Sequence, residues 1–267
     1  MSSRATNDPE TTVERGVAVT LDAERHLAVV EIRRGPNNFF DLDVLTRLAE
    51  SIEALAAGTT RAVVLCSEGK NFCAGADFSG ARGSIRQEGA PHLYDVAIRL
   101  FEQPLPIVAA VQGAAIGGGL GLALAADLRI ASPSSRFAAN CAMVGFHQGF
   151  GLSVTLPLVV GHQAAIDLLY TGRRIDGTTA HRIGLCDHLV PDEELRSRAI
   201  EAAGEIAAAA PLAVRSIRQT MRGRLALEVR AAMAHERAEQ ERLQRTADFA
   251  EGIAAMGERR TPRFLGR

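Results

Sequence analysis

The sequences NFCAGADF at residues 71–78 and QGAAIGGG at residues 112–119 are the strongest indication of the fold of this chain. Each follows a short apolar run, residues 62–66 and 106–111, with the composition of a buried strand. Small residues let the backbone approach another group closely, and a helix beginning there adds unpaired N–H donors. Two converging donors would stabilise negative charge on a carbonyl oxygen. The glycines are also compatible with close helix–strand packing and no ligand.

The surrounding sequence predicts alternating strands and helices, and therefore an α/β core with parallel strands. Asp43 is expected to cap the helix after the first hairpin, and residues 79–90 to form a mobile loop. Three regions follow: a disordered N-terminus at 1–12, the α/β core at 13–200 and a helical region at 201–267. We expect strands at 17–20, 27–32, 62–66, 106–111 and 128–131, and helices at 43–57, 91–101, 119–126, 153–160, 163–170, 192–209, 211–222 and 225–244.

Composition excludes several classes of function. The 267 residues carry a formal net charge of −1, which favours neither a nucleic acid nor a membrane surface as partner. The four cysteines form no C-x-x-C pair and no His/Cys spacing resembles a zinc site, so we expect reduced thiols and no metal. The first fifteen residues lack the apolar core of a secretory signal, which predicts a cytoplasmic protein.

Three segments resemble, in order, those of the crotonase superfamily, the enoyl-CoA hydratase/isomerase family. They are FCAGADF at 72–78, AAVQGAAIGGG at 109–119 and RIDGTTAHRIGLCD at 174–187. The resemblance runs from about residue 17 to the C-terminus. It implies a spiral of β-β-α units that assembles as a homotrimer or hexamer, with 201–267 as the trimerisation region. It also implies an acyl-CoA thioester as ligand, with coenzyme A as part of the substrate and no separate cofactor.

The resemblance also assigns residues to the site. The backbone N–H groups of Ala76 and Gly118 would form the oxyanion hole. The basic-aromatic ending at 259–264 resembles a family tail that can reach the coenzyme A of a neighbouring subunit. The expected substrate-binding residues are Phe39, Ala74, Asp77, Phe78, Gly117 and Cys141, of which Asp77 could instead brace the glycine turn.

The chain departs from the family at the two glutamates that its hydratases use for proton and water handling. Gly121 and Cys141 stand in those places. A well-placed acid or base contributes about 10²–10⁴ in rate, so most hydratase activity should be lost. His147 is the best candidate for a replacement acid or base, because an unperturbed imidazole titrates near neutrality. A hydrogen-bonded structural histidine is the alternative.

These features leave three hypotheses open. The first is an acyl-CoA enzyme that polarises a thioester carbonyl and catalyses something other than ordinary hydration. The second is an enoyl-CoA hydratase/isomerase of fatty-acid metabolism, in which other groups place the water. The third is a protein that binds acyl-CoA without turnover.

Overall fold

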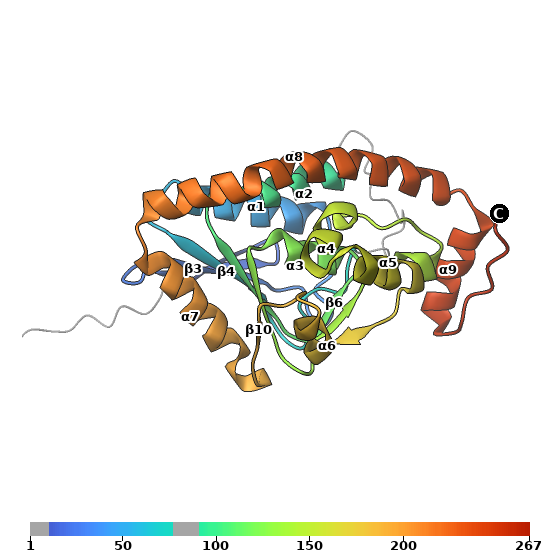
Figure 1. Cartoon of the computed structure of the whole chain (residues 1–267), viewed down its shortest axis with the longest axis horizontal. Helices are drawn as coiled ribbons and strands as arrows, with labels where there is room; N and C mark the ends of the chain where they lie inside the picture. Colours follow the sequence, from blue (N-terminus) through green and yellow to red (C-terminus); the bar gives the residue numbers. More distant parts are fainter. Residues whose placement is uncertain (1–10, 77–90) are drawn as a thin grey trace, which may run out of the picture.

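The computed structural model describes residues 11–76 and 91–267 (Figure 1). Its main sheet has seven strands in the order β1-β2-β3-β4-β5-β7-β10. The first three pair antiparallel, and all pairs from β3 to β10 are parallel, as the strand–helix alternation predicted. The strands are β1 (Thr11–Glu14), β2 (Val17–Asp22), β3 (Leu27–Ile32), β4 (Ala62–Ser67), β5 (Ile107–Val111), β7 (Leu128–Ala131) and β10 (His188–Leu189).

The predicted N-terminal hairpin is confirmed and is extended by one strand. β2 and β3 pair in register around a turn in which Arg25 N donates to Asp22 Oδ1 at 3.0 Å. β1 pairs with β2, placing Thr11 opposite Thr20. Ordered structure therefore begins inside the segment expected to be disordered, whose residues 1–10 lie outside the described part of the chain.

The two faces of the sheet are covered by different helices. In β4, Val63 and Leu65 face one cluster of buried side chains and Val64 faces the other, because successive strand residues point to opposite sides. α7 (Leu195–Ala208) covers the second face with small residues such as Ala199 and Ala203. The first face is covered by α1 (Leu42–Ala56), α2 (Leu93–Phe101), α3 (Gly118–Ala125) and α8 (Pro211–Leu243), which spans the top of Figure 1.

The cap of α1 differs from the prediction. The N-cap is Asp41, whose side chain accepts from Val44 N at 2.9 Å, and Asp43 lies in the first turn. Both aspartates favour a helix start. Asp41 takes the capping position because its backbone is still extended and its carboxylate reaches the third residue of the helix.

The C-terminal region also differs. The two helices expected at 211–222 and 225–244 are one helix, α8. Gly223 does not break it, because a glycine inside a helix costs only about 1 kcal/mol and the turn that follows is held by buried Leu225 and Val229. Besides these, the described residues form the strands β6 (Ala114–Ile116), β8 (Arg136–Ala138) and β9 (Ile175–Asp176). The remaining helices are α4 (Leu152–Val160), α5 (His162–Thr171), α6 (Gly177–Arg182), α9 (Ala247–Glu258) and the 3-10 helices η1 (Asn140–Val144) and η2 (Asp192–Glu194).

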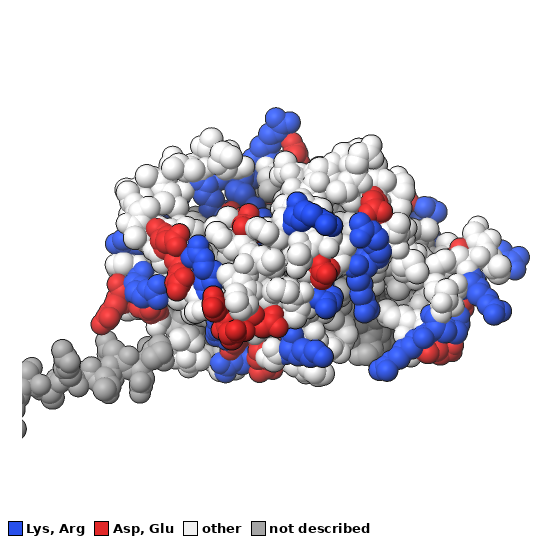
Figure 2. All heavy atoms as spheres, turned by 60° about the horizontal axis from the view of Figure 1, so that its bottom comes forward, with Lys and Arg blue, Asp and Glu red and all other residues white. Residues whose placement is uncertain are grey.

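The surface carries charges of both signs. On the face shown in Figure 2, basic and acidic side chains are interspersed among uncharged ones. Among the helices of the described residues, none combines the length and apolar character needed to span a bilayer. Cytoplasmic location stays a prediction.

Candidate active site

The two glycine-bearing segments lie side by side. Cys73 N donates to Ala114 O at 2.8 Å, and Ile116 N returns a bond to Cys73 O at 3.0 Å. Phe72 N donates to Gln112 O at 2.8 Å. These bonds join the loop after β4 to β6, which leads into α3. Segments about 40 residues apart in the chain therefore meet where the sequence predicted a site.

The peptide unit between Gly75 and Ala76 lies beside the second segment. Phe40 N donates to Gly75 O at 3.0 Å, and a trans peptide directs its N–H opposite to its C=O. The Ala76 N–H therefore points away from Phe40. A β-carbon on Gly75 would lie 3.1 Å from Ile116 O and 3.9 Å from Gly118 N. With a φ of 109°, Gly75 also has a backbone conformation that strongly favours glycine.

The peptide unit between Gly117 and Gly118 has a similar arrangement. Gly117 O accepts from Leu120 N at 3.0 Å and from Gly121 N at 3.2 Å, which starts α3. The Gly118 N–H therefore points off the helix start, where the helix dipole adds partial positive charge. Gly117 reaches this geometry with a φ of 55° and a ψ of −117°, a conformation available mainly to glycine. Within 11–76 and 91–267, neither the Ala76 nor the Gly118 amide has a hydrogen-bond acceptor.

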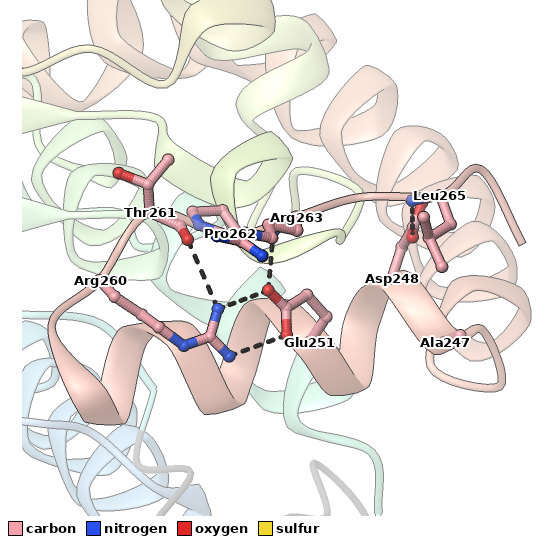
Figure 3. Close-up of a pocket in the computed structure, with 8 residues that line it drawn as sticks. All are labelled: Ala247, Asp248, Glu251, Arg260, Thr261, Pro262, Arg263 and Leu265. Carbon is pink, nitrogen blue, oxygen red and sulfur yellow. Dashed lines mark hydrogen bonds and ion pairs between the residues drawn. The ribbon is translucent and has the colours of Figure 1, made fainter.

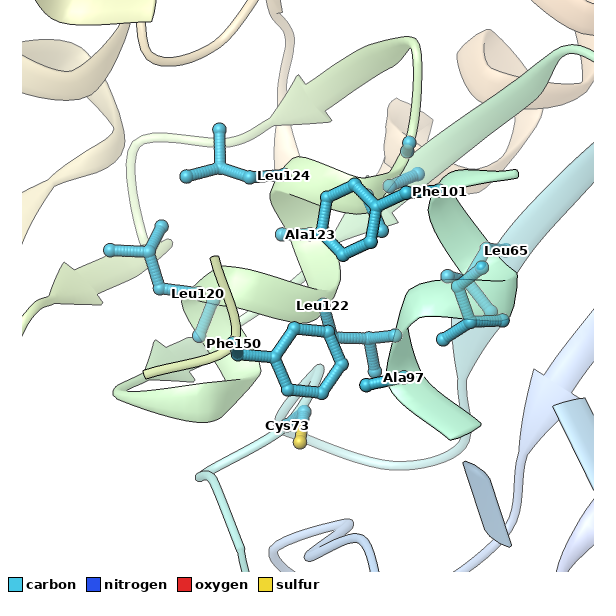
Figure 4. Packing of buried hydrophobic residues seen from close by; sticks show 14 of the residues in the cluster. Leu65, Cys73, Ala97, Phe101, Leu120, Leu122, Ala123, Leu124 and Phe150 are labelled. Carbon is cyan, nitrogen blue, oxygen red and sulfur yellow. The ribbon is translucent and has the colours of Figure 1, made fainter. Parts of the chain in front are cut away.

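Aromatic rings pack on the face of α3 beside these amides. A β-carbon on Gly118 would lie 2.5 Å from Phe40 Cζ, and one on Gly121 would lie 2.6 Å from Phe150 Cβ. The two rings are themselves 5.3 Å apart, and both are buried. Figure 4 shows Phe150 within this cluster of apolar side chains. The place where a side chain of residue 121 would begin is thus filled by an aromatic residue.

Polar side chains of α8 hold the segment that carries Phe150. Tyr94 Oη donates to Gln240 Oε1 at 2.8 Å, and Gln240 Nε2 donates to His147 O at 3.0 Å. One turn earlier, the Glu236 carboxylate accepts from Gly151 N at 2.9 Å and from Ser153 N at 3.0 Å. We did not predict these contacts of Glu236, Gln240 and Tyr94 from the sequence.

A signal for two of these residues is present in the sequence. The buried stripe of α8 runs through Leu225, Val229 and Met233. It continues, at the three- and four-residue spacing of one helix face, onto Glu236 and Gln240. Polar residues at core positions of a helix need partners, which makes them candidates for positioning roles.

His147 is partly buried, and its contacts lead toward α8. Its Nδ1 lies 2.8 Å from Gln148 O, and its ring centroid lies 5.8 Å from that of His235. No contact among the described residues joins its ring to Ala76 or Gly118. The role of His147 as acid or base stays a prediction.

Cys141 lies in η1, near the buried stripe of α8. Burial, assisted by the charge of Glu236, raises the pKa of the Cys141 thiol to about 12. The thiol is therefore neutral at physiological pH. A neutral thiol can contact a ligand but does not activate water as a carboxylate does.

Of the other expected substrate-binding residues, the structure describes Phe39, Ala74 and Gly117. Phe39 is partly exposed and precedes the isolated bridge between Phe40 and Ala76. The Ala74 amide donates to Asn37 O at 3.0 Å. Both backbone groups of Gly117 are engaged, since its N–H also donates to Ala138 O at 2.8 Å. Asp77 and Phe78 lie outside the described residues.

The C-terminal tail folds back along α9. Arg260 is held by the Glu251 carboxylate, with an Nη1–Oε1 distance of 2.5 Å, and Leu265 N donates to Asp248 Oδ1 at 2.6 Å. A cavity of about 860 Å³ lies between tail and helix (Figure 3), lined by Ala247, Asp248, Glu251, Arg260, Thr261, Pro262, Arg263 and Leu265. The predicted reach of the tail to a neighbouring subunit is not tested by these contacts.

Comparison with known proteins gives a consistent result. The model of the family described as enoyl-CoA hydratase/isomerase matches residues 22–267. The human mitochondrial enoyl-CoA hydratase domain-containing protein 2 is 34% identical over 84% of this chain and 80% of its own length. The enoyl-CoA isomerase/hydratase fer4 of Mycosarcoma maydis is 34% identical over 78% of this chain and 77% of its own. An enoyl-CoA hydratase/isomerase crystal structure from Pseudoalteromonas atlantica superposes with a TM-score of 0.86 at 32% identity, covering 94% of this chain and all of that one.

Proposed function

We propose, from the premise that this chain belongs to the enoyl-CoA hydratase/isomerase family, that it binds an acyl-CoA thioester and polarises the thioester carbonyl. The backbone amides of Ala76 and Gly118 would donate to the thioester oxygen. Coenzyme A would enter as part of the substrate, with no separate cofactor. Negative charge that develops on the oxygen would be stabilised by donors already fixed in place, each worth about 3 kcal/mol in comparable enzymes.

One observation carries this proposal. Two neighbouring peptide units, 75–76 and 117–118, each accept hydrogen bonds through their carbonyl, and within the described part of the chain neither of their amides has an acceptor. The 3.9 Å between a β-carbon on Gly75 and Gly118 N supports a common target for the two amides. Aromatic packing by Phe40 and Phe150 keeps this part of α3 apolar, which strengthens hydrogen bonds to a developing charge.

The residues around the amides favour a reaction other than ordinary hydration. Gly121 carries no side chain, and Cys141 is a neutral thiol. An enolate or a tetrahedral oxyanion needs the carbonyl to be polarised but not these two carboxylates. Isomerisation, decarboxylation, C–C cleavage and thioester hydrolysis all pass through such a species. His147 is our candidate for the acid or base.

The names of the relatives favour a second candidate function. Human and fungal proteins at 34% identity are named for enoyl-CoA hydratase or isomerase chemistry. If this chain hydrates enoyl-CoA, a group other than residues 121 and 141 must place the water. Acyl-CoA binding without turnover is the third possibility.

Three measurements separate these functions. Cinnamoyl-CoA absorbs at longer wavelength when its carbonyl accepts strong hydrogen bonds, so we expect a red shift on binding. Absence of binding, or absence of the shift in a saturated complex, would refute the proposal. A crotonyl-CoA hydration assay tests the second candidate, and a panel of acyl-CoA thioesters followed by mass spectrometry reports any other turnover. His147→Ala should abolish that turnover and leave acyl-CoA affinity near wild type, and unchanged turnover would remove His147 from the mechanism.

The predicted homotrimer or hexamer is part of the same proposal. The expected trimerisation region, 201–267, carries exposed apolar side chains on α8, which an interface would cover: Leu212, Ile217, Met221 and Leu227. Light scattering coupled to gel filtration would give the molar mass, and a monomer would contradict the prediction.

A further inference from the structure

We propose that Glu236 is a positioning residue of the candidate site. It fixes the left-handed turn at Phe150 and Gly151, and thereby holds the Phe150 ring in its packed position against Gly121 of α3. The inference rests on the proposed function, because α3 begins with the amide that would bind the thioester oxygen.

Glu236 does what a capping side chain does at the start of α4. The N-cap of α4 is Gly151, which has no side chain to bind the free amides of the first turn. Glu236 reaches across from α8 and accepts from Gly151 N and Ser153 N. A carboxylate is especially suited to this place, because a helix N-terminus carries partial positive charge.

The burial of Glu236 makes this contact unusual in the molecule. Its side chain is fully buried, and among the described residues it has no ion-pair partner. Glu31, the other buried glutamate of the described residues, is bound by Arg33 and Arg196. A buried carboxylate without a cation is costly unless hydrogen bonds compensate it. Here the Gly151 and Ser153 amides at the start of α4 supply those hydrogen bonds. The buried carboxylate of Glu236 and the turn at 150–151 therefore stabilise each other.

The turn held by Glu236 has an unfavourable backbone conformation. Phe150 has a φ of 58° and Gly151 a φ of 75°. The left-handed region is strained for a phenylalanine and persists only where the surroundings enforce it. The same turn places Phe150 Cβ against Gly121 and the Phe150 ring beside Phe40. Phe40 in turn covers Gly118.

Contacts therefore run without a gap from Glu236 to the amide of Gly118. They pass through the backbone of 150–151, the ring of Phe150 and the first turns of α3. Gln240 holds the other end of the segment through His147 O, so α8 fixes both ends of residues 147–153. Loss of the hydrogen bonds from Gly151 N and Ser153 N to Glu236 should let the Phe150 ring move away from Gly121. The first turn of α3 should then become more mobile.

The test uses the full-length protein and cinnamoyl-CoA. In Glu236→Gln, one of the two backbone amides loses its acceptor and the charge is removed. We expect acyl-CoA affinity to fall about tenfold and the red shift at saturating ligand to become smaller. The saturated shift reports the geometry of the bound carbonyl and does not depend on the affinity or on the amount of folded protein. Glu228→Gln is the matched control, because Glu228 lies on the exposed face of α8 and its ion-pair partner among the described residues is Arg224.

The outcomes distinguish this inference from the proposed function. A wild-type red shift in saturated Glu236→Gln overturns the inference alone. No red shift in the wild type removes the proposed function and the inference with it. If Glu236→Gln does not fold, Phe150→Leu tests the same contact with the carboxylate in place, and a wild-type shift in that variant would also overturn the inference.

Discussion

Replacing Gly121 by alanine should destabilise the protein, although alanine is the better helix former. The new methyl group would lie 2.6 Å from Phe150 Cβ and 2.9 Å from Phe150 Cγ. Overpacking of this kind costs about 2 kcal/mol, whereas the helix propensity of alanine returns about 1 kcal/mol. The net expectation is a loss of about 1 kcal/mol in the free energy of unfolding.

Gly223→Ala is the matched control for this prediction. Gly223 also lies inside a helix, but a β-carbon there would meet nothing within 4 Å. The free energy of unfolding should therefore rise by about 1 kcal/mol. The two glycine-to-alanine changes should differ in sign, by about 2 kcal/mol in total.

A double mutant tests the cause. In a Phe150→Gly background both the ring and the β-carbon that the new methyl group would meet are gone. Gly121→Ala should then stabilise the protein by about 1 kcal/mol, which gives a coupling energy of about 2 kcal/mol. Urea unfolding followed by circular dichroism, at one fixed protein concentration, measures all variants. If Gly121→Ala stabilises the protein as much as Gly223→Ala does, the packing argument at α3 is refuted.

Two further predictions concern buried charges and thiols. Asp127→Asn should lower the free energy of unfolding by about 3 kcal/mol in the same urea assay. The reason is that the Asp127 carboxylate accepts from the buried Arg218 guanidinium at 3.0 Å and lies 3.3 Å from Arg222 Nε. A loss below about 1 kcal/mol would contradict this prediction. Burial raises the pKa of each of the four cysteine thiols from its ordinary value of 9.0 to about 12. Above pH 9 the unfolded chain therefore releases protons that the folded chain keeps. Stability is therefore retained below pH 9 and should fall between pH 9 and 12, by about 1.4 kcal/mol per pH unit for each fully buried thiol. Cys73→Ala should reduce that slope, and an unchanged slope would show that Cys73 ionises as readily in the folded state.

Local sequence was sufficient for the sheet and for the placement of the two glycine segments. β4 and β5 are continuous apolar runs because they are buried on both faces, and β7 was located at 128–131 as predicted. Gly75 and Gly117 have backbone conformations that strongly favour glycine, so the sequence itself marked the two turns.

Sequence was not sufficient where several local solutions have similar energy. Asp41 and Asp43 are both acceptable caps, and the position of the chain leaving Phe40 decides between them. A break at Gly223 would cost little in isolation, but the packing of Leu225 and Val229 keeps α8 continuous. These choices depend on contacts with residues far away in the chain.

The amino-acid sequence fixes which backbone turns are available, because glycine at 75 and 117 permits conformations that side chains disfavour. The parallel direction of β4 and β5, expected from the strand–helix alternation, brings those turns to one edge of the sheet. The surroundings of these turns, in contrast, depend on the packing of the folded chain. Glu236 lies 85 residues after Gly151, and Phe150 lies opposite Gly121, so neither contact has a local signature. Side-chain burial and the hydrogen bonds that compensate it depend on the complete packed chain, because a buried charge needs partners, and for Glu236 these are backbone amides far away in the sequence.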